Sequence, residues 1–81
     1  MKAHVFVTLK SGVLDPQGKA IHHSVGQLGH RNLADIRQGK YFELTFADGT
    51  DADAAQTTAE TIANDVLANP VIEDYRVEVS E

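Results

Sequence analysis

The chain has no cysteine, few cations and no long hydrophobic run. Without cysteine it can form neither a disulfide nor a thiolate zinc site, and it has no cysteine nucleophile. Seven Lys and Arg residues against twelve Asp and Glu residues give a net charge of -5. This balance argues against nucleic acid as the main partner, because phosphate binding needs clustered cations. No apolar run approaches the roughly 20 residues that span a bilayer, and no signal-peptide core follows Met1–His4. We therefore expect a cytoplasmic protein without a membrane partner.

The 81 residues are enough for one small domain, which we assign to residues 1–81. Hydrophobic residues make up 42% and charged residues 23% of the chain, as in ordinary folded proteins. A domain of this size buries only a thin core, so burial of further surface by oligomerisation is expected.

Periodicity predicts four strands and two helices. Residues 2–10 alternate as a strand, and Asp15 and Gly29 are suited to cap a helix over residues 16–28. Residues 33–47 predict two strands joined by a turn at residues 37–40, with one bulged strand as the alternative. A second helix over residues 53–68 and a strand over residues 71–79 follow. The order predicts an α+β fold, a ferredoxin-like two-layer sandwich (βαββαβ) with an antiparallel sheet and both helices on one face.

The sheet face without helices carries two aromatic residues, Phe6 and Tyr41, among charged and polar neighbours. We expect them to anchor a second subunit, giving a homodimer or a tetramer. The alternative is that they are ordinary isolated exposed aromatics.

The histidines do not predict a metal site. His22 and His23 are adjacent, so on a helix they point about 100° apart. His30 lies too far from His22 to share its face, and no acidic residue is present in the helix to complete a ligand shell. We therefore interpret them as solvated surface histidines.

The residues also predict no catalytic group. Gly39 and Lys40 could hold an anion beside Arg37, but we interpret them as a turn with solvated cations. An acylphosphatase on this topology would need an arginine in the loop 11–15, and none is present there. The run Asp48, Asp51 and Asp53 is typical of helix capping. The pattern thus indicates a module without its own catalytic site.

Three motifs, in this order and spacing, carry a resemblance to a known family. They are VLDPQGKA at residues 13–20, GKY-x-EL at residues 39–44 and LANPVIE at residues 67–73. With these motifs and this length, the chain resembles PurS, the small subunit of phosphoribosylformylglycinamidine synthase, over essentially its whole length.

The resemblance implies a role in de novo purine biosynthesis that is shared among three chains. In such a complex, a glutaminase subunit releases ammonia from glutamine. A large synthetase subunit uses ATP and magnesium to activate the amide oxygen of formylglycinamide ribonucleotide, and ammonia then displaces phosphate to give the amidine. The small subunit bridges the two and assists ammonia transfer, and it binds no cofactor itself.

Residues 15–19 are more elaborate than a helix start requires, since Gly18 and Lys19 are both unfavourable there. We expect Gly18 to admit a partner backbone and Lys19, with Arg37 and Lys40, to meet an acidic partner surface; Asp15 belongs to the same candidate contact. The alternative is internal packing of Gly18 and solvated cations. A different function on the same topology, a small-molecule-binding regulatory module, would need a pocket at a subunit interface lined by the first loop.

Overall fold

Three antiparallel strands form the sheet, in the order β2-β1-β3. The computed structural model describes residues 1–81. The strands are β1 (Lys2–Leu9), β2 (Gly39–Thr45) and β3 (Glu73–Ser80). The central strand β1 has Val5 opposite Phe42 on one side and opposite Val77 on the other. The predicted first and last strands are therefore confirmed, with small shifts at their ends.

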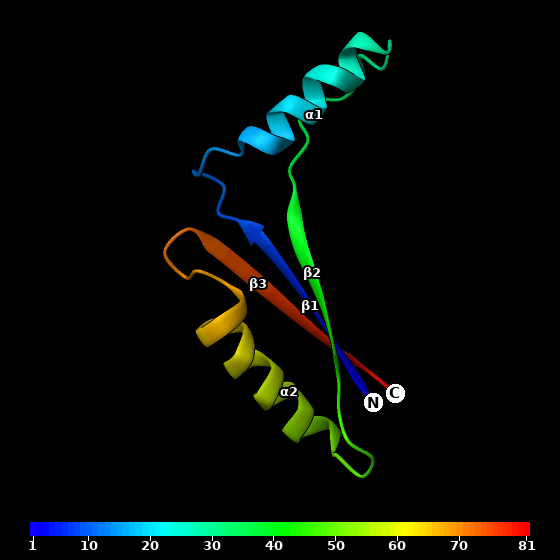
Figure 1. Ribbon diagram of the computed structural model, residues 1–81, viewed down its shortest axis with the longest axis vertical. Helices are drawn as coiled ribbons and strands as arrows, with labels where there is room; N and C mark the ends of the chain where they lie inside the picture. Colours follow the sequence, from blue (N-terminus) through cyan, green and yellow to red (C-terminus); the bar gives the residue numbers. More distant parts are fainter.

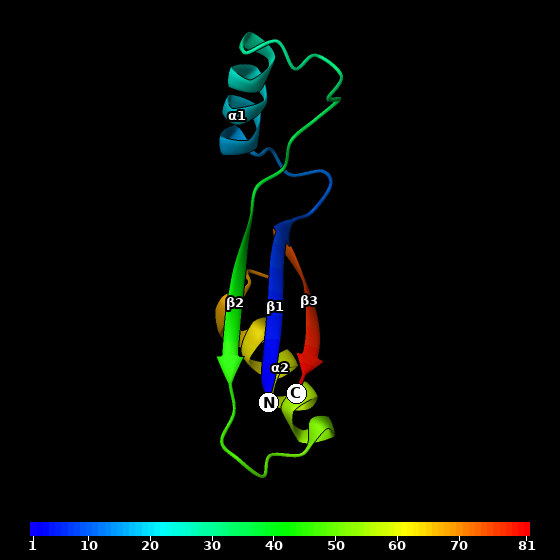
Figure 2. The same ribbon diagram turned by 90° about the vertical axis from the view of Figure 1, so that its right-hand side faces the viewer.

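One face of the sheet is covered by α2 (Ala52–Ile62), which continues into a π-helical turn, η1 (Ala63–Leu67) (Figure 2). The alternation of β1 turns Ala3, Val5 and Val7 toward this helix, where they are fully buried. The helix contributes only alanines to the fully buried layer, at positions 55, 59 and 63. Small side chains let the helix axis come close to the sheet.

Local signals explain where this helix begins and ends. Asp51 caps α2 by accepting a hydrogen bond from the Asp53 N–H at 3.1 Å. The chain leaves η1 just before Asn69 and Pro70, because a residue before proline avoids the helical region. The predicted second helix is confirmed.

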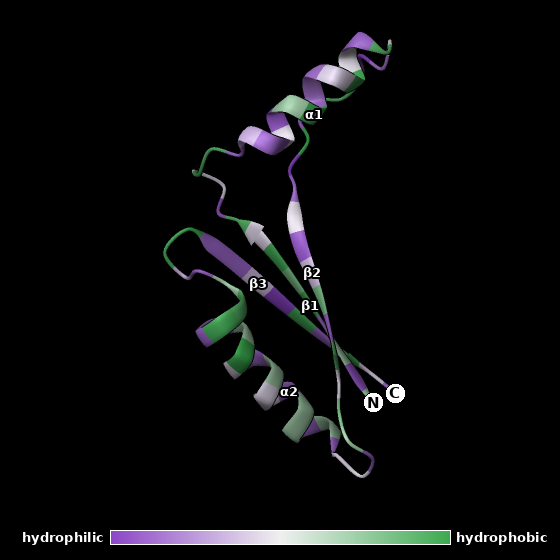
Figure 3. Cartoon of the chain, in the orientation of Figure 1, coloured by the Kyte–Doolittle hydropathy of each residue, from purple (hydrophilic) through white to green (hydrophobic).

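The first helix, α1 (Pro16–Gln27), lies beyond the end of the strands and not on the sheet (Figures 1 and 3). The α+β class, the antiparallel sheet and the two helices are confirmed. The expected placement of both helices on one face is corrected, since α2 alone covers the sheet.

The expected hairpin over residues 33–47 is replaced by one strand, β2, preceded by an irregular segment over residues 30–38. The physical reason lies in what this segment contacts. The Gln38 N–H donates to the Asp15 carboxylate at 2.7 Å, and Ile36 lies against Gly18. The segment is therefore held by the start of α1 and does not pair with a strand.

The resulting molecule is elongated, with extents of 50 × 26 × 14 Å. Its radius of gyration is 16.1 Å, whereas a compact chain of this length has about 12 Å. Only nine of 81 residues are buried, and large apolar side chains such as Leu14, Leu28 and Val71 are exposed. None of the helices is long and apolar enough to cross a membrane.

The alanine layer of α2 predicts a sharp dependence on side-chain size. Ala59→Leu should lower the free energy of unfolding by about 1–3 kcal/mol, because a larger side chain cannot fit between the helix and the sheet. Ala54→Leu on the exposed side of the same helix is the matched control and should change it by less than about 0.5 kcal/mol. Urea denaturation of both variants measures the difference, and equal stabilities would contradict this packing.

Candidate partner-binding site

The candidate contact residues lie where β1, α1 and the segment before β2 meet. Asp15 is at the centre of this junction and is only 4% exposed. Its Oδ1 accepts the Gly18 N–H at 2.9 Å and its Oδ2 accepts the Gln38 N–H at 2.7 Å. One carboxylate thus caps α1 and also fixes the segment that leads into β2.

Arg37 closes the same junction from outside. Its Nε lies 4.0 Å from the Asp15 carboxylate, and its Nη2 donates to the carbonyl oxygens of Lys10 and Val13, each at 3.1 Å. Gln38 adds a hydrogen bond from its side chain to that of Gln17 at 2.7 Å. The guanidinium therefore crosslinks the loop after β1 to the segment before β2.

The electrostatics of Asp15 follow from these contacts. The backbone N–H groups of Gln38 and Gly18 hold the pKa of its carboxyl below the usual range, and Arg37 acts in the same direction. The ionised form is therefore the one that the junction stabilises.

Gly18 is buried against the chain's own backbone. A Cβ added at this position would collide with the Ile36 carbonyl oxygen and would lie 2.7 Å from the Asp15 carboxylate. The absence of a side chain is thus explained inside the molecule, by the close approach of residues 36–38 to α1. This is internal packing, although against a loop and not against the sheet.

The three predicted cations do not form one cluster. Lys40 lies on β2, where its ammonium is 3.4 Å from Glu73 and donates to the Leu67 carbonyl oxygen at 3.2 Å. Arg37 is engaged at Asp15, as described above. Lys19 forms no ion pair within the chain, although it lines a hollow under the first loop together with Arg37 and Asp15. A partner contact at these residues stays a prediction.

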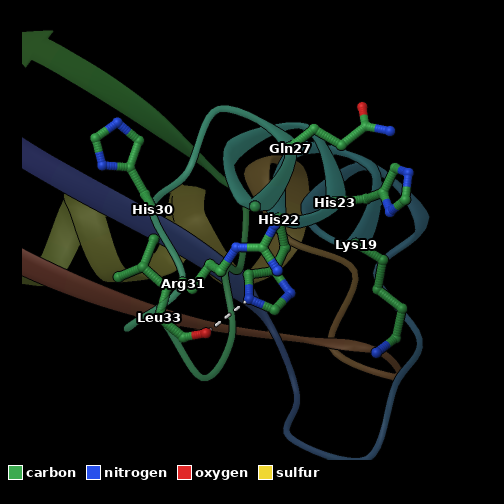
Figure 4. A pocket seen from close by; sticks show the side chains of 8 residues that line it. Lys19, His22, His23, Gln27, His30, Arg31 and Leu33 are labelled. Atoms are coloured by element: carbon green, nitrogen blue, oxygen red, sulfur yellow. Dashed lines mark hydrogen bonds between the residues drawn. The ribbon is translucent and has the colours of Figure 1, made fainter.

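Lys19 also borders a shallow depression of about 520 Å³ between α1 and the segment that follows it (Figure 4). The segment is tied to the helix by His22, whose Nε2–H donates to the Leu33 carbonyl oxygen at 2.8 Å. The depression is lined by cations, imidazoles and neutral residues: Lys19, His22, His23, Gly26, Gln27, His30, Arg31 and Leu33. Sequence reasoning took the histidines one by one and missed this grouping. The signal was available, since no acidic residue occurs in residues 16–34.

A second hollow, of about 290 Å³, lies under the first loop, with Ser11, Gly12 and Arg37 among its lining residues. It is formed within one chain. The alternative of a regulatory module, which needs a pocket at a subunit interface, stays a prediction.

The open sheet face carries the aromatic pair where the sequence placed it. Phe6 and Tyr41 are opposite each other in the β1–β2 register, with ring centroids 5.2 Å apart. The Arg76 guanidinium lies 4.5 Å from the centre of the Phe6 ring. His4 hydrogen-bonds with the Tyr41 hydroxyl at 2.6 Å and with the Ser80 hydroxyl at 2.8 Å. This face is ordered by side-chain contacts and is not covered by a helix.

A charged pair borders the aromatic residues on this face. The Lys2 ammonium lies 2.7 Å from the Glu43 carboxylate. This hydrogen-bonded pair holds the pKa of Glu43 below its usual range and raises that of Lys2.

Comparison with known protein families identifies the family of this chain. The family model for PurS, described as phosphoribosylformylglycinamidine (FGAM) synthase, matches residues 2–81. This chain belongs to the PurS family.

Named PurS proteins match it at nearly full length. The phosphoribosylformylglycinamidine synthase subunit PurS of Bacillus subtilis is 45% identical over 80 residues, which are 99% of this chain and 93% of that protein. A solved structure of B. subtilis PurS has a TM-score of 0.81 at 43% identity and covers 99% of this chain and 98% of its own. Methanocaldococcus jannaschii PurS has a TM-score of 0.86 at 31% identity, with 99% and 95% covered.

In this PurS-family chain the motif VLDPQGKA forms the junction around Asp15. Its aspartate and proline start α1, and its glycine admits the segment before β2. The motif therefore has a structural explanation in the single chain.

The lowered pKa of Asp15 predicts a pH-dependent contribution to stability. A carboxyl with a lower pKa in the folded state stabilises the fold above its unfolded pKa, near 3.8, and this contribution is lost as the pH falls through the folded pKa. Asp15→Asn should therefore be less stable than the parent chain at pH 7, and the difference should shrink below about pH 4.

Urea denaturation from neutral to acidic pH measures this trend. Asp48→Asn is the matched control, because Asp48 is exposed and accepts no hydrogen bond. A stability difference for Asp15→Asn that is unchanged at low pH would contradict the ionised-carboxylate junction.

Proposed function

We propose that this chain is the non-catalytic small subunit of a three-chain phosphoribosylformylglycinamidine synthase. In this role it bridges a glutaminase subunit and a large synthetase subunit and assists the passage of ammonia between them. The observation that carries the proposal is membership of the PurS family over residues 2–81. The relatives support it by name: B. subtilis PurS is called a synthase subunit, and M. jannaschii PurS is called one of the subunits of formylglycinamide ribonucleotide amidotransferase in the purine biosynthetic pathway.

The shape of the chain supports an assembly role. The radius of gyration of 16.1 Å and the position of α1 leave much of that helix and one face of the sheet open. A small domain with so little buried surface gains stability by covering these areas with other chains. A bridging subunit requires such separated surfaces.

A small rigid chain can assist the transfer of ammonia without a catalytic group of its own. Ammonia is largely protonated near neutral pH, and the ammonium ion is no nucleophile. An enclosed passage keeps ammonia from water until it attacks the activated amide carbon and phosphate leaves. The small subunit would align or seal that passage. ATP and magnesium would act on the large subunit, this chain would bind no cofactor, and the complex would work in the cytoplasm.

Self-association is part of the proposal. Phe6 and Tyr41 form an apolar patch on the open sheet face, and Tyr41 is 52% exposed. A second copy stacked on this face would cover both rings, giving a homodimer that could pair into a tetramer.

Reconstitution tests the bridging role. The chain alone should form no product from glutamine, ammonia, ATP and formylglycinamide ribonucleotide. Added to the glutaminase and synthetase subunits of the same organism, it should raise glutamine-dependent amidine formation by at least about tenfold, because ammonia is then delivered and not lost. Synthesis with added ammonium chloride should depend on it less. Full glutamine-dependent activity of the two larger chains without this one would contradict the proposal.

Removal of the aromatic patch tests self-association. The double variant Phe6→Ser, Tyr41→Ser should have the mass of a monomer by light scattering at micromolar concentration, whereas the parent chain should have at least twice that mass. Tyr75→Ser, which removes a partly exposed aromatic from the opposite face, is the control and should leave the mass unchanged. A monomeric parent chain, or a double variant that still associates, would refute this interface.

A further inference from the structure

Five of the seven cationic side chains of this protein have an acidic partner within 4.0 Å. The pairs are Lys2–Glu43, Lys10–Asp74, Arg37–Asp15, Lys40–Glu73 and Arg76–Glu78. Lys19 and Arg31 are the two exceptions. Both side chains are exposed, and neither of them forms an ion pair or a hydrogen bond within the chain.

These two unpaired cations border the same depression, the one between α1 and residues 30–33. His22, His23 and His30 line it with them, and their rings add N–H donors. Residues 16–34 contain no acidic residue, so all twelve acidic residues lie elsewhere in the chain. Asp15 and Asp35 flank this stretch, but the helix that extends beyond the sheet itself carries no acidic residue (Figure 1).

We propose that this cationic depression is the docking surface for an acidic patch on one of the two larger subunits. The proposal rests on the proposed function and names the chemistry of the partner surface. Unpaired, exposed cations at the tip of an elongated chain attract carboxylates over the Debye length and orient the approach of a partner. Because the two cations have no ion pair within the chain to break first, they can form an ion pair with a partner at a lower cost in free energy.

The arrangement of the side chains favours a protein surface over a single phosphate group. Figure 4 shows Arg31 beside His22 in the middle, Lys19 and His23 on one side and His30 on the other. A compact anion is held by donors that converge on one point. Donors spread over a shallow surface fit several carboxylates that lie apart, as on an acidic protein face.

A second copy of the chain fits less well. Its acidic run, Asp48, Asp51 and Asp53, lies at the start of α2, and the Asp51 carboxylate already caps that helix.

Charge reversal on the depression tests the proposal. Each variant, Arg31→Glu or Lys19→Glu, is titrated into a fixed mixture of the two larger subunits, and the concentration that gives half-maximal glutamine-dependent activity is measured. Reversal should raise this concentration by about tenfold at an ionic strength of about 0.1 M. For the parent chain, this half-maximal concentration should rise steeply as the ionic strength is raised to about 1 M, because salt screens the charges. For the variants, the same increase in ionic strength should raise it less.

Lys10→Glu is the matched control, since it changes the net charge equally but lies outside the depression, in a surface pair worth little. It should titrate like the parent chain. Circular dichroism and light scattering should be unchanged in all variants; an acidic residue near the start of α1 also suits the helix dipole, so Lys19→Glu should fold.

The outcomes separate the two proposals. If the parent chain neither binds the larger subunits nor raises glutamine-dependent activity, the proposed function itself fails. If the parent chain is active and both variants titrate like it at low ionic strength, only the docking surface is refuted. It is also refuted if the variants change the mass of the chain alone, which indicates a second copy. Competition by millimolar inorganic phosphate, beyond that of chloride at equal ionic strength, would refute it in favour of a phosphate site.

Discussion

The buried carboxylate of Asp15 holds together three segments that are separate in the sequence. It accepts the N–H groups of Gly18 and Gln38, and it lies under Arg37, which in turn binds the loop after β1. Buried charge is costly unless it is paired and hydrogen-bonded, and here both conditions are met. The direction of α1, the path of residues 30–38 and the entry into β2 all depend on this one group.

A junction of this kind explains why the molecule has two unlike ends. Around the sheet, α2 packs through alanines on β1 and forms an ordinary core. At the other end, α1 is held in place by polar contacts at its first turn and by the hydrogen bond from His22 to the Leu33 carbonyl oxygen. The helix is therefore positioned by the chain without being covered by it. That is a suitable arrangement for a subunit whose remaining surfaces are completed by other chains.

The cations also differ between the two ends of the molecule. Lys2, Lys40 and Arg76 are paired on the strands, and Lys10 and Arg37 are paired beside them, whereas the depression on α1 carries the two unpaired cations. The aromatic patch on the open sheet face lies on a different surface from this depression. One chain thus presents an apolar surface on the sheet and a cationic surface on α1, and the two share no residue.

Much of this could be predicted from the sequence, because the signals are local. Alternation in residues 2–10 and the caps at Asp15, Asp51 and Gly29 determined the first strand and the two helices to within one or two residues. The placement of Phe6 and Tyr41 on the open face of the sheet follows from the period of two.

Tertiary structure alone decided the rest. Residues 33–38 have the pattern of a strand, yet contacts with Gly18 and Asp15 hold them away from the sheet. Arg37 and Lys40 looked as free as Lys19, yet each finds an acid far away in the sequence, and only Lys19 and Arg31 do not. Local periodicity sets secondary structure, but which charges are neutralised depends on which distant segments come together, and that is a property of the folded chain.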